Sequence, residues 1–238
     1  MWSLLIALLY PPACLLCHGT VTEEAAVLCE RCRSALPAVA KPGCPRCGLS
    51  LSAAYDACVT CAACRRRPPA FDHAAAVWEY RDTGATLIRQ IKQQRRWRLS
   101  RWAAQQLATT ADTALPLTEI NAVVAVPHHR LTRWLRGYDP AELLARDVAH
   151  RVRKPYLSHA LRQIKWTQQQ HRLPSKAARF RNVRRAFAAS RRLVDRQAIL
   201  LIDDVMTSRA TAHACAAALK ASGARAVYVV TAARTPTR

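Results

Sequence analysis

The 238-residue chain is poor in acidic residues and glycine and has no long apolar run. It has 15 Asp and Glu against 37 Lys and Arg, which gives a formal net charge of +22 at pH 7. Only 6 glycines and no low-complexity tract exclude fibrous and linker-like sequence classes. The longest apolar run, residues 2–10, is far shorter than the roughly 20 residues of a membrane span. It lacks a basic start and ends at two prolines, so we interpret it as a short packing helix and expect a cytoplasmic protein.

The positive charge is unevenly distributed along the chain. Residues 1–70 carry +3, from seven basic and four acidic residues, whereas residues 71–238 carry +19, from 30 and 11. Arginine makes up 31 of the 37 basic residues, and its planar fork binds phosphate and stacks on flat rings. A codon bias explains arginine in place of lysine, but it does not explain the excess of base over acid. The composition therefore indicates a partner rich in phosphate.

Nine of the ten cysteines lie within residues 14–64, as three pairs and a final run of three in which neighbouring cysteines are separated by two residues. Such a pair points both sulfurs at one metal ion, and two pairs complete a tetrahedral thiolate site. The cysteine count of the cluster is odd and no export signal is visible, so a disulfide framework fits poorly. We predict two structural zinc ions, because four thiolates leave no open position for a substrate. A catalytic or redox role is the less favoured alternative.

The spacing assigns one zinc ion to Cys14, Cys17, Cys29 and Cys32, and a second to Cys44, Cys47, Cys61 and Cys64. The second set has an alternative, because Cys58 and Cys61 are also separated by two residues, and Cys58 then replaces Cys64. In the favoured assignment Cys58 is a spare thiol. Interleaved pairing of the first cysteine pair with the third is a further alternative. We expect Cys215, in an alanine-rich helical stretch, to be a buried apolar residue.

Residues 1–68 are predicted to form a double zinc ribbon, and residues 69–238 a second domain. In the second domain, apolar periodicity predicts alternating strands and helices, which indicates a parallel sheet with crossover helices. Residues 155–185 show weak periodicity and are interpreted as a loop plus a helix. The expected strands are residues 74–80, 122–126, 198–202 and 227–231, and the expected helices are residues 83–107, with a break near Arg95, 140–152 and 211–221.

Two adjacent carboxylates, Asp203 and Asp204, follow a buried strand and precede a polar turn and a helix. Open parallel sheets bind ligands at the carboxyl ends of their strands, and a helix start suits phosphate. Thr207, Ser208 and Thr211 add hydroxyl donors, while the carboxylates can accept hydrogen bonds from a sugar. This pattern favours a phosphorylated pentose as ligand. The alternative is a strand–turn–helix unit in which Asp only caps the helix.

The same segment resembles the signature of type I phosphoribosyltransferases, in which two acidic residues precede a Thr/Ser-rich loop. The resemblance implies a type I phosphoribosyltransferase-like parallel sheet with flanking helices. It also implies that phosphoribosyl pyrophosphate (PRPP) is the ligand, usually with magnesium. Asp203 and Asp204 would then face the ribose hydroxyls, and the loop would wrap the 5′-phosphate. The loop residues are Thr207, Ser208, Arg209, Ala210 and Thr211.

Other stretches are similar to the ComF family across nearly the whole chain. They are the cysteine-rich start, Pro68–Asp72, and residues 87–92, 126–139 and 181–187. The resemblance implies a double zinc ribbon joined to a phosphoribosyltransferase-like domain. It also implies a role in DNA uptake during natural competence, with proteins of the competence machinery as partners. No settled reaction belongs to that family.

The sequence departs from the family pattern at two places. Position 209 is Arg where the phosphate loop normally has Gly, whose backbone reaches positive φ freely. Arg209 is therefore expected either to crowd the phosphate or to place its guanidinium on it. Asp139 and Pro140 stand where the family usually has Asn and Gln, which weakens any pyrophosphate role of that turn.

If catalysis occurs, the family pattern assigns roles by motif position. Asp203 and Asp204 would position the ribose ring and offset the positive charge that builds on it. Lys92, Arg130 and Arg133 are candidates for pyrophosphate, together with magnesium. His128 and His129 are weaker acid/base candidates, since exposed turn histidines are commonly inert. The sequence shows no motif for the acceptor.

A second functional class is a scaffold that binds single-stranded DNA without chemistry. Arginines alternate with Trp97 and Trp102, and single-strand binding uses phosphate neutralisation and base stacking. The arginine clusters in residues 95–101 and 179–196 would then flank one groove. The favoured interpretation of the tryptophans is nevertheless that they are core residues and that the arginines beside them are solvated. The alternating arginines are Arg95, Arg96, Arg98 and Arg101.

Overall fold

The computed structural model describes residues 12–21, 26–40, 42–51, 59–93, 96–128, 137–167 and 173–236. Its centre is a sheet of four parallel strands in the order β1-β6-β5-β2. The strands are β1 (His73–Glu79), β2 (Ala122–Ala125), β5 (Ala198–Met206) and β6 (Ala226–Arg234). The predicted fold class, a parallel sheet with flanking helices behind a small double zinc ribbon, is confirmed. Within the described ranges, every helix is too short or too polar to span a bilayer.

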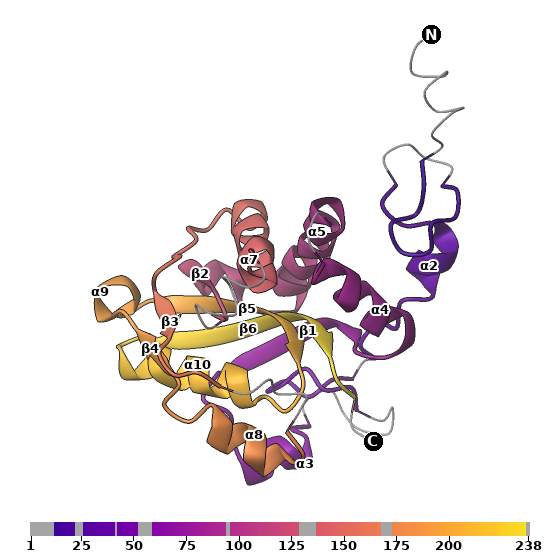
Figure 1. Ribbon diagram of the computed structural model, residues 1–238. Helices are drawn as coiled ribbons and strands as arrows, with labels where there is room; N and C mark the ends of the chain where they lie inside the picture. Colours follow the sequence, from indigo (N-terminus) through magenta and orange to yellow (C-terminus); the bar gives the residue numbers. More distant parts are fainter. Residues whose placement is uncertain are drawn as a thin grey trace.

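Helices cover both faces of the sheet (Figure 1). One face carries α4 (Asp82–Ile91), α5 (Trp97–Ala114) and α7 (Pro140–Arg151), and the other carries α8 (Lys176–Asn182) and α10 (Ala210–Ala221). Successive residues of β5 point to opposite faces of the sheet, so the strand contributes side chains to the cores on both faces. Leu200 and Ile202 join the core under α5 and α7, while Ile199 and Leu201 join the core under α10.

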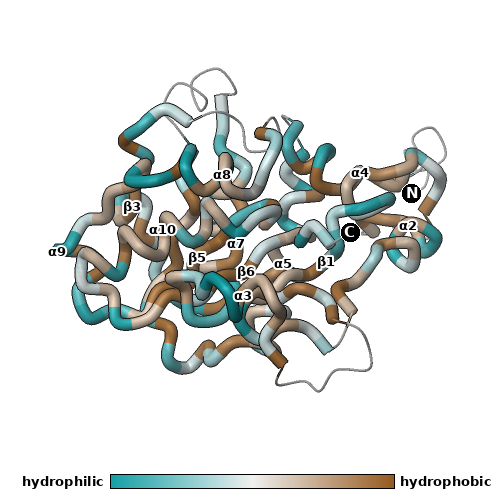
Figure 2. The backbone as a smooth tube through the Cα atoms, turned by 90° about the horizontal axis from the view of Figure 1, so that it is seen from below, coloured by the Kyte–Doolittle hydropathy of each residue, from teal (hydrophilic) through white to brown (hydrophobic). Residues whose placement is uncertain are grey.

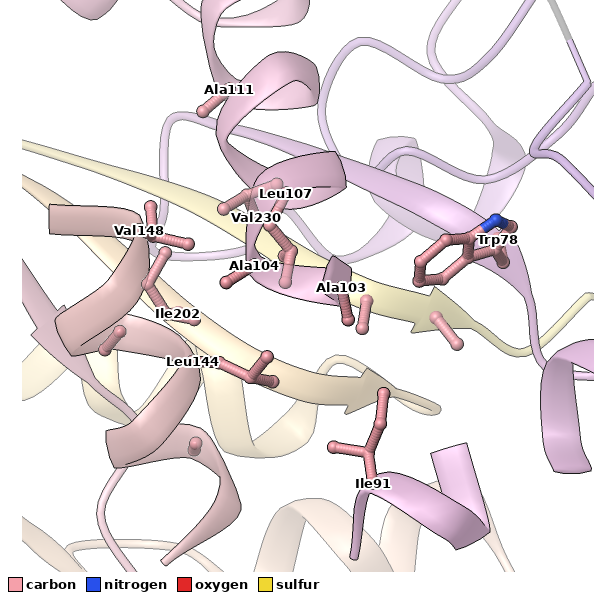
Figure 3. Close-up of a cluster of buried hydrophobic side chains, with 14 of the residues drawn as sticks. Trp78, Ile91, Ala103, Ala104, Leu107, Ala111, Leu144, Val148, Ile202 and Val230 are labelled. Atoms are coloured by element: carbon pink, nitrogen blue, oxygen red, sulfur yellow. The ribbon is translucent and has the colours of Figure 1, made fainter. Parts of the chain in front are cut away.

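Small residues let α5 and α7 approach the sheet and each other closely (Figure 3). Ala103, Leu107 and Ala111 recur every four residues along α5, so they share one face, and all three are fully buried. Leu144 and Val148 present the equivalent face of α7 toward Ile202 and Val230. The predicted break near residue 95 separates α4 from α5, and Arg95 itself lies outside the described residues.

The segment between α7 and β5 differs from the expectation of a loop plus one helix. It contains α8, but also an antiparallel pair formed by β3 (Leu161–Gln163) and β4 (Phe187–Ala189). The two strands have three residues each, too few for an alternating pattern to be visible in the sequence. A 3₁₀ turn, η1 (Leu117–Glu119), and α9 (Arg191–Val194) complete the elements of this domain.

The two zinc ribbons repeat the same hairpin thirty residues apart. The amide of Cys14 donates to the Gly19 carbonyl at 2.8 Å, and the amide of Cys44 donates to the Leu49 carbonyl at the same distance. Each hairpin is followed by a one-turn helix that starts directly after a cysteine: α2 (Glu30–Ser34) and α3 (Ala62–Arg66). The first ribbon packs into the core of the α5 face, whereas the second packs into the core of the α10 face.

The connection between the ribbons lies along the open edge of the sheet. Ala38 forms an antiparallel bridge with Trp78 of β1. Around it, the Val39 amide donates to the Val77 carbonyl at 3.2 Å, and the Glu79 amide donates to the Pro37 carbonyl at 2.7 Å. Main-chain groups at this edge therefore have partners. Viewed from below, the strands are brown and tan at the centre, and teal residues gather at the periphery, as at α9 (Figure 2).

Candidate functional site

The eight predicted zinc ligands gather into the same two sets of four that their spacing predicts. Within each set the sulfurs lie within 4.8 Å of one another. The Sγ atoms of Cys17 and Cys29 are 3.7 Å apart, and those of Cys47 and Cys61 are 3.8 Å apart. A tetrahedral ion with zinc–sulfur bonds of about 2.3 Å requires sulfurs about 3.8 Å apart. Both sets therefore fit structural zinc, with Cys64 in the second set; Cys58 lies outside the described residues.

The acidic pair lies inside strand β5, which extends to Met206 and so runs beyond the predicted end at residue 202. Asp203 and Asp204 are both buried, and the Asp204 amide donates to Asp203 Oδ1 at 2.9 Å. Burial, and then the neighbouring Asp204, raise the pKa of Asp203 to about 7. Ionising both buried carboxylates is therefore unfavourable, and a nearby cation or hydrogen-bond donor would stabilise the ionised pair.

Lys92, at the end of α4, lies against this pair. Its Nζ is 3.0 Å from Asp204 Oδ2. Burial opposes the charge of Lys92, but the attraction of Asp204 is stronger overall, and the pKa of Lys92 is raised. Of the three predicted pyrophosphate residues, Lys92 is therefore adjacent to the acidic pair, while Arg130 and Arg133 lie outside the described residues, as does His129.

His128 and Asp139 form an ion pair that was not predicted. His128 Nδ1 is 2.9 Å from Asp139 Oδ1, and the Asp139 side chain also caps α7 by accepting from the Ala141 amide at 3.1 Å. Burial disfavours both charges, but each partner favours the other, so the pKa of His128 is raised and that of Asp139 is lowered. An Asp followed by Pro at a helix start was the available signal for the cap, with Pro140 at the first helical position.

The predicted phosphate loop, residues 207–211, consists of a turn at residues 207–209 and the first two residues of the twelve-residue helix α10. Ser208 is buried, and its Oγ accepts from the Ala210 amide at 3.4 Å, while Thr207 and Thr211 are partly exposed. The first turn of a helix leaves amide groups without partners inside the helix, and the helix dipole adds positive potential there. The loop and helix start therefore have the chemistry of an anion site.

The structure places the Arg209 side chain on the second zinc ribbon, a contact that the sequence did not predict. The φ of Arg209 is +67°, the left-handed conformation for which the family uses Gly. Its guanidinium lies on the second zinc ribbon: Nη1 is 2.7 Å from Cys64 Sγ, and Nη2 donates to the Ala63 carbonyl at 3.3 Å. This orientation depends on packing between segments that are far apart in the chain, which the sequence did not reveal.

Arg234, at the end of β6, is a site residue that the sequence analysis missed. It is buried, and its Nη1 donates to the carbonyls of Met206 at 2.8 Å and Thr207 at 2.5 Å. Its Nε donates to the Cys47 carbonyl at 3.3 Å. The signal available in the sequence was a charged residue that ends an otherwise apolar strand.

The two tryptophans of the arginine-rich helix differ in environment. Trp97 is 59% exposed, which contradicts the expectation that it is a core residue. Trp102 packs partly into the core and stacks on Trp78, with ring centroids 5.4 Å apart. Both border a hollow of about 380 Å³ between α5 and the first ribbon. Its basic lining residues are Arg33, Arg98, Arg101 and Arg151.

The second arginine cluster does not flank the same groove, contrary to expectation. Arg181, Arg184 and Arg185 line a separate hollow of about 680 Å³ between α8 and α10, on the opposite face of the sheet (Figure 1). Phe180 lies in this hollow with the Arg67 guanidinium 4.2 Å from its ring centre. Among the described residues, the two arginine clusters therefore line separate hollows.

Comparisons with known proteins agree with this architecture. Residues 5–65 match the family model described as double zinc ribbon domain. The chain is 26% identical over 221 residues to competence protein F of Haemophilus influenzae, covering 91% of this chain and 94% of that protein. It is 29% identical over 224 residues to the DNA utilization protein YhgH of Salmonella typhi, covering 92% and 95%. The predicted resemblance to ComF proteins is thus confirmed over most of the chain.

Two solved structures are also similar to part of the chain. One is glutamine PRPP amidotransferase from B. subtilis complexed with ADP and GMP, with 21% sequence identity and a TM-score of 0.38. The other is described as the allosteric regulatory enzyme of purine biosynthesis, with 22% identity and the same TM-score. Each match covers 56% of this chain and only 25% of the solved chain.

Proposed function

We propose that this protein is a ComF-like protein that supports DNA uptake and binds PRPP at the carboxyl end of β5. The observation that carries the proposal is the buried pair Asp203 and Asp204, held beside Lys92 and followed directly by a loop and a long helix. Carboxylates in this position accept hydrogen bonds from sugar hydroxyls, and the helix start attracts phosphate. The relatives named for competence and DNA utilization support the biological role.

In this proposal each part of PRPP has its own partners. Asp203 and Asp204 accept from the ribose hydroxyls, and Thr207, Ser208 and Thr211, with the backbone of Arg209 and Ala210, surround the 5′-phosphate. Lys92, Arg130 and Arg133 attract the pyrophosphate. Magnesium, when bound with PRPP, would neutralise pyrophosphate charge, and carboxylate oxygens such as those of Asp203 and Asp204 are the ligands that such a hard cation prefers.

Because the pKa of Asp203 is raised, PRPP binding should depend on pH. A carboxyl that accepts from two hydroxyls or faces a cation must be ionised, and the pKa of Asp203 is about 7 in the free protein. PRPP with magnesium should therefore bind more tightly at pH 8 than at pH 6, by roughly tenfold if one proton is released per ligand bound.

Titration calorimetry with PRPP and magnesium tests this site. The double variant Asp203→Asn, Asp204→Asn should bind at least roughly tenfold more weakly and lose the pH dependence, while remaining folded. The matched control is Glu30→Gln, which removes an acid exposed on the first ribbon. Equal binding by the acidic-pair variant and the wild type would refute the assignment.

The biological role needs a separate test, because PRPP binding alone does not establish it. The gene should restore transformation to a Haemophilus influenzae strain that lacks competence protein F. The Asp203→Asn, Asp204→Asn form should fail to do so if PRPP binding serves DNA uptake. Release of pyrophosphate from PRPP with candidate acceptors would show in addition that the domain is an active phosphoribosyltransferase.

We propose single-strand DNA binding as a second candidate function, favoured by the exposed Trp97 in the hollow lined by Arg98 and Arg101. Fluorescence anisotropy over a salt series should give a log–log slope of about −0.7 for each phosphate contacted. Trp97→Ala should weaken binding by about 1–3 kcal/mol through lost stacking. Phe180→Ala, on the opposite face, is the control, and equal losses from both variants would argue against this surface.

A further inference from the structure

Two arginines connect the phosphate loop to the second zinc centre, formed by Cys44, Cys47, Cys61 and Cys64. Arg209 belongs to the loop and reaches outward to a zinc-binding sulfur. Arg234 comes from β6 and reaches both the loop carbonyls and a carbonyl of the zinc ribbon. The two links start from different elements and end on different cysteine pairs of the same centre.

The first link explains why an arginine occupies a left-handed position. A side chain at φ +67° is strained, and such strain persists only where surrounding contacts hold it. Here the guanidinium fork donates to Cys64 Sγ and to the Ala63 carbonyl, both at the start of α3. The backbone conformation of the loop and the position of the zinc ribbon are therefore fixed together.

The second link acts on the other side of the loop. Arg234 is buried, so its charge needs partners, and its guanidinium donates to four carbonyl oxygens: those of Met206, Thr207 and Thr235, and that of Cys47 in the ribbon. Displacing Cys47 would remove one of these partners and leave a buried cation less satisfied. The loop would have to move to compensate.

We propose that the second zinc centre is the support that positions the phosphate loop, and that Arg209 and Arg234 transmit this support. Four zinc-bound thiolates carry net negative charge, which an adjacent guanidinium offsets, and donors to metal-bound groups commonly raise metal retention. The coupling is reciprocal: whatever holds the loop also holds the ion. That the loop binds phosphate rests on the proposed function, whereas the coupling itself does not.

Zinc retention tests the Arg209 link without any phosphate ligand. The zinc-loaded protein is mixed with a chromogenic chelator, and release of its two ions is followed over time. Arg209→Ala and Arg209→Gly should both release one ion roughly 10–100-fold faster than the wild type, and the other ion unchanged. Arg65→Ala is the control, because Arg65 lies beside Cys64 but donates to the Thr60 carbonyl.

The paired variants separate the guanidinium from the backbone. Both remove the guanidinium, but only Gly accepts the positive φ without strain. Equal acceleration in the two variants supports the proposal. Normal zinc release in both variants, normal release in Arg209→Gly alone, or equal acceleration in Arg65→Ala would overturn it.

Hydrogen exchange of the loop provides the second readout. Amides in residues 204–212 should exchange faster in Arg209→Ala and in Arg234→Lys, because lysine cannot reproduce the fork of Nε and Nη1 donors. Amides in α7 serve as the internal reference. Unchanged exchange in the loop of both variants would refute the coupling. If the Arg209 and Arg234 variants show the expected changes in zinc release and loop exchange but the wild type does not bind PRPP, only the proposed ligand role is refuted.

Discussion

The two zinc ribbons have the same hairpin but different surroundings. In the first ribbon Cys17 and Cys29 are partly exposed, whereas all four ligands of the second ribbon are buried. The first contributes to the core beneath α5, and the second contributes to the core beneath α10 and touches the phosphate loop. Cysteine spacing therefore predicts where metal binds, but the neighbours decide what each metal centre supports.

One turn position shows how the surroundings select the residue. In each ribbon, the residue that follows the first cysteine pair has a left-handed backbone: His18 has φ +61° and Gly48 has φ +62°. A Cβ at position 48 would lie only 3.0 Å from the Ala74 carbonyl oxygen and 3.2 Å from Ala75 Cα. Close packing against β1 thus favours glycine in the second ribbon, whereas the exposed turn of the first tolerates histidine.

The largest expected difference between the ribbons comes from losing one metal. Cys47→Ser should lower the free energy of unfolding by about 4–5 kcal/mol, because it disrupts a centre whose four ligands are all buried and which Arg209 and Arg234 connect to the phosphate loop. Cys14→Ser should mainly loosen the first ribbon and leave a cooperative transition for the rest. Urea unfolding with zinc analysis measures both, and equal losses would contradict the contrast between the ribbons.

The buried Asp203 should also make the stability of the protein depend on pH. Because the pKa of Asp203 is raised from 3.8 to about 7 on folding, its contribution is present below pH 4 and lost as pH rises through 7. The loss is at most about 1.4 kcal/mol per pH unit. Asp203→Asn should therefore become more stable relative to the wild type between pH 4 and 8, measured by thermal unfolding.

The two tryptophans that border the hollow beside the first ribbon should show a smaller difference in their effects on stability. Trp102→Ala should cost about 2 kcal/mol of stability, since it removes the stacking on Trp78 and part of the core. Trp97→Ala should change stability by less than about 0.5 kcal/mol because its side chain is exposed. Differential scanning calorimetry of the two variants checks this; a larger loss from Trp97→Ala would show that Trp97 is buried in solution.

The smallest expected effect concerns the turn glycines. Gly48→Ala should destabilise the protein by about 1 kcal/mol, because alanine is strained at positive φ and meets the backbone of β1. At Gly19 the nearest atom to an added Cβ is Cys17 Sγ at 3.4 Å, an ordinary contact, so Gly19→Ala should be nearly neutral. Equal unfolding midpoints in urea for both variants would contradict this difference.

The sequence predicted features that local patterns encode. Cysteine pairs indicated the metal centres, and apolar runs indicated the four strands, although β5 and β6 extend beyond their predicted ends. Cys215 is fully buried, as expected. These signals are local because metal ligation needs a fixed spacing and buried strands need continuous apolar residues.

What the sequence did not reveal depends on contacts between distant segments. The guanidinium of Arg209 meets a sulfur 145 positions away, and the Nε of Arg234 meets a carbonyl 187 positions away. His128 and Asp139 are 11 positions apart, and their contact depends on how the segment after β2 lies against the start of α7. No propensity or periodicity encodes such pairings.

The bridge between Ala38 and Trp78 has a consequence for solubility. The inter-ribbon connection occupies the outer edge of β1 and is anchored by a zinc ribbon at each end. If both ions are lost, the anchors loosen and the main-chain donors and acceptors of an apolar edge strand become available to other molecules. Edge-to-edge pairing between chains then competes with refolding. Zinc starvation should therefore deplete this protein by aggregation as well as by loss of its metal centres.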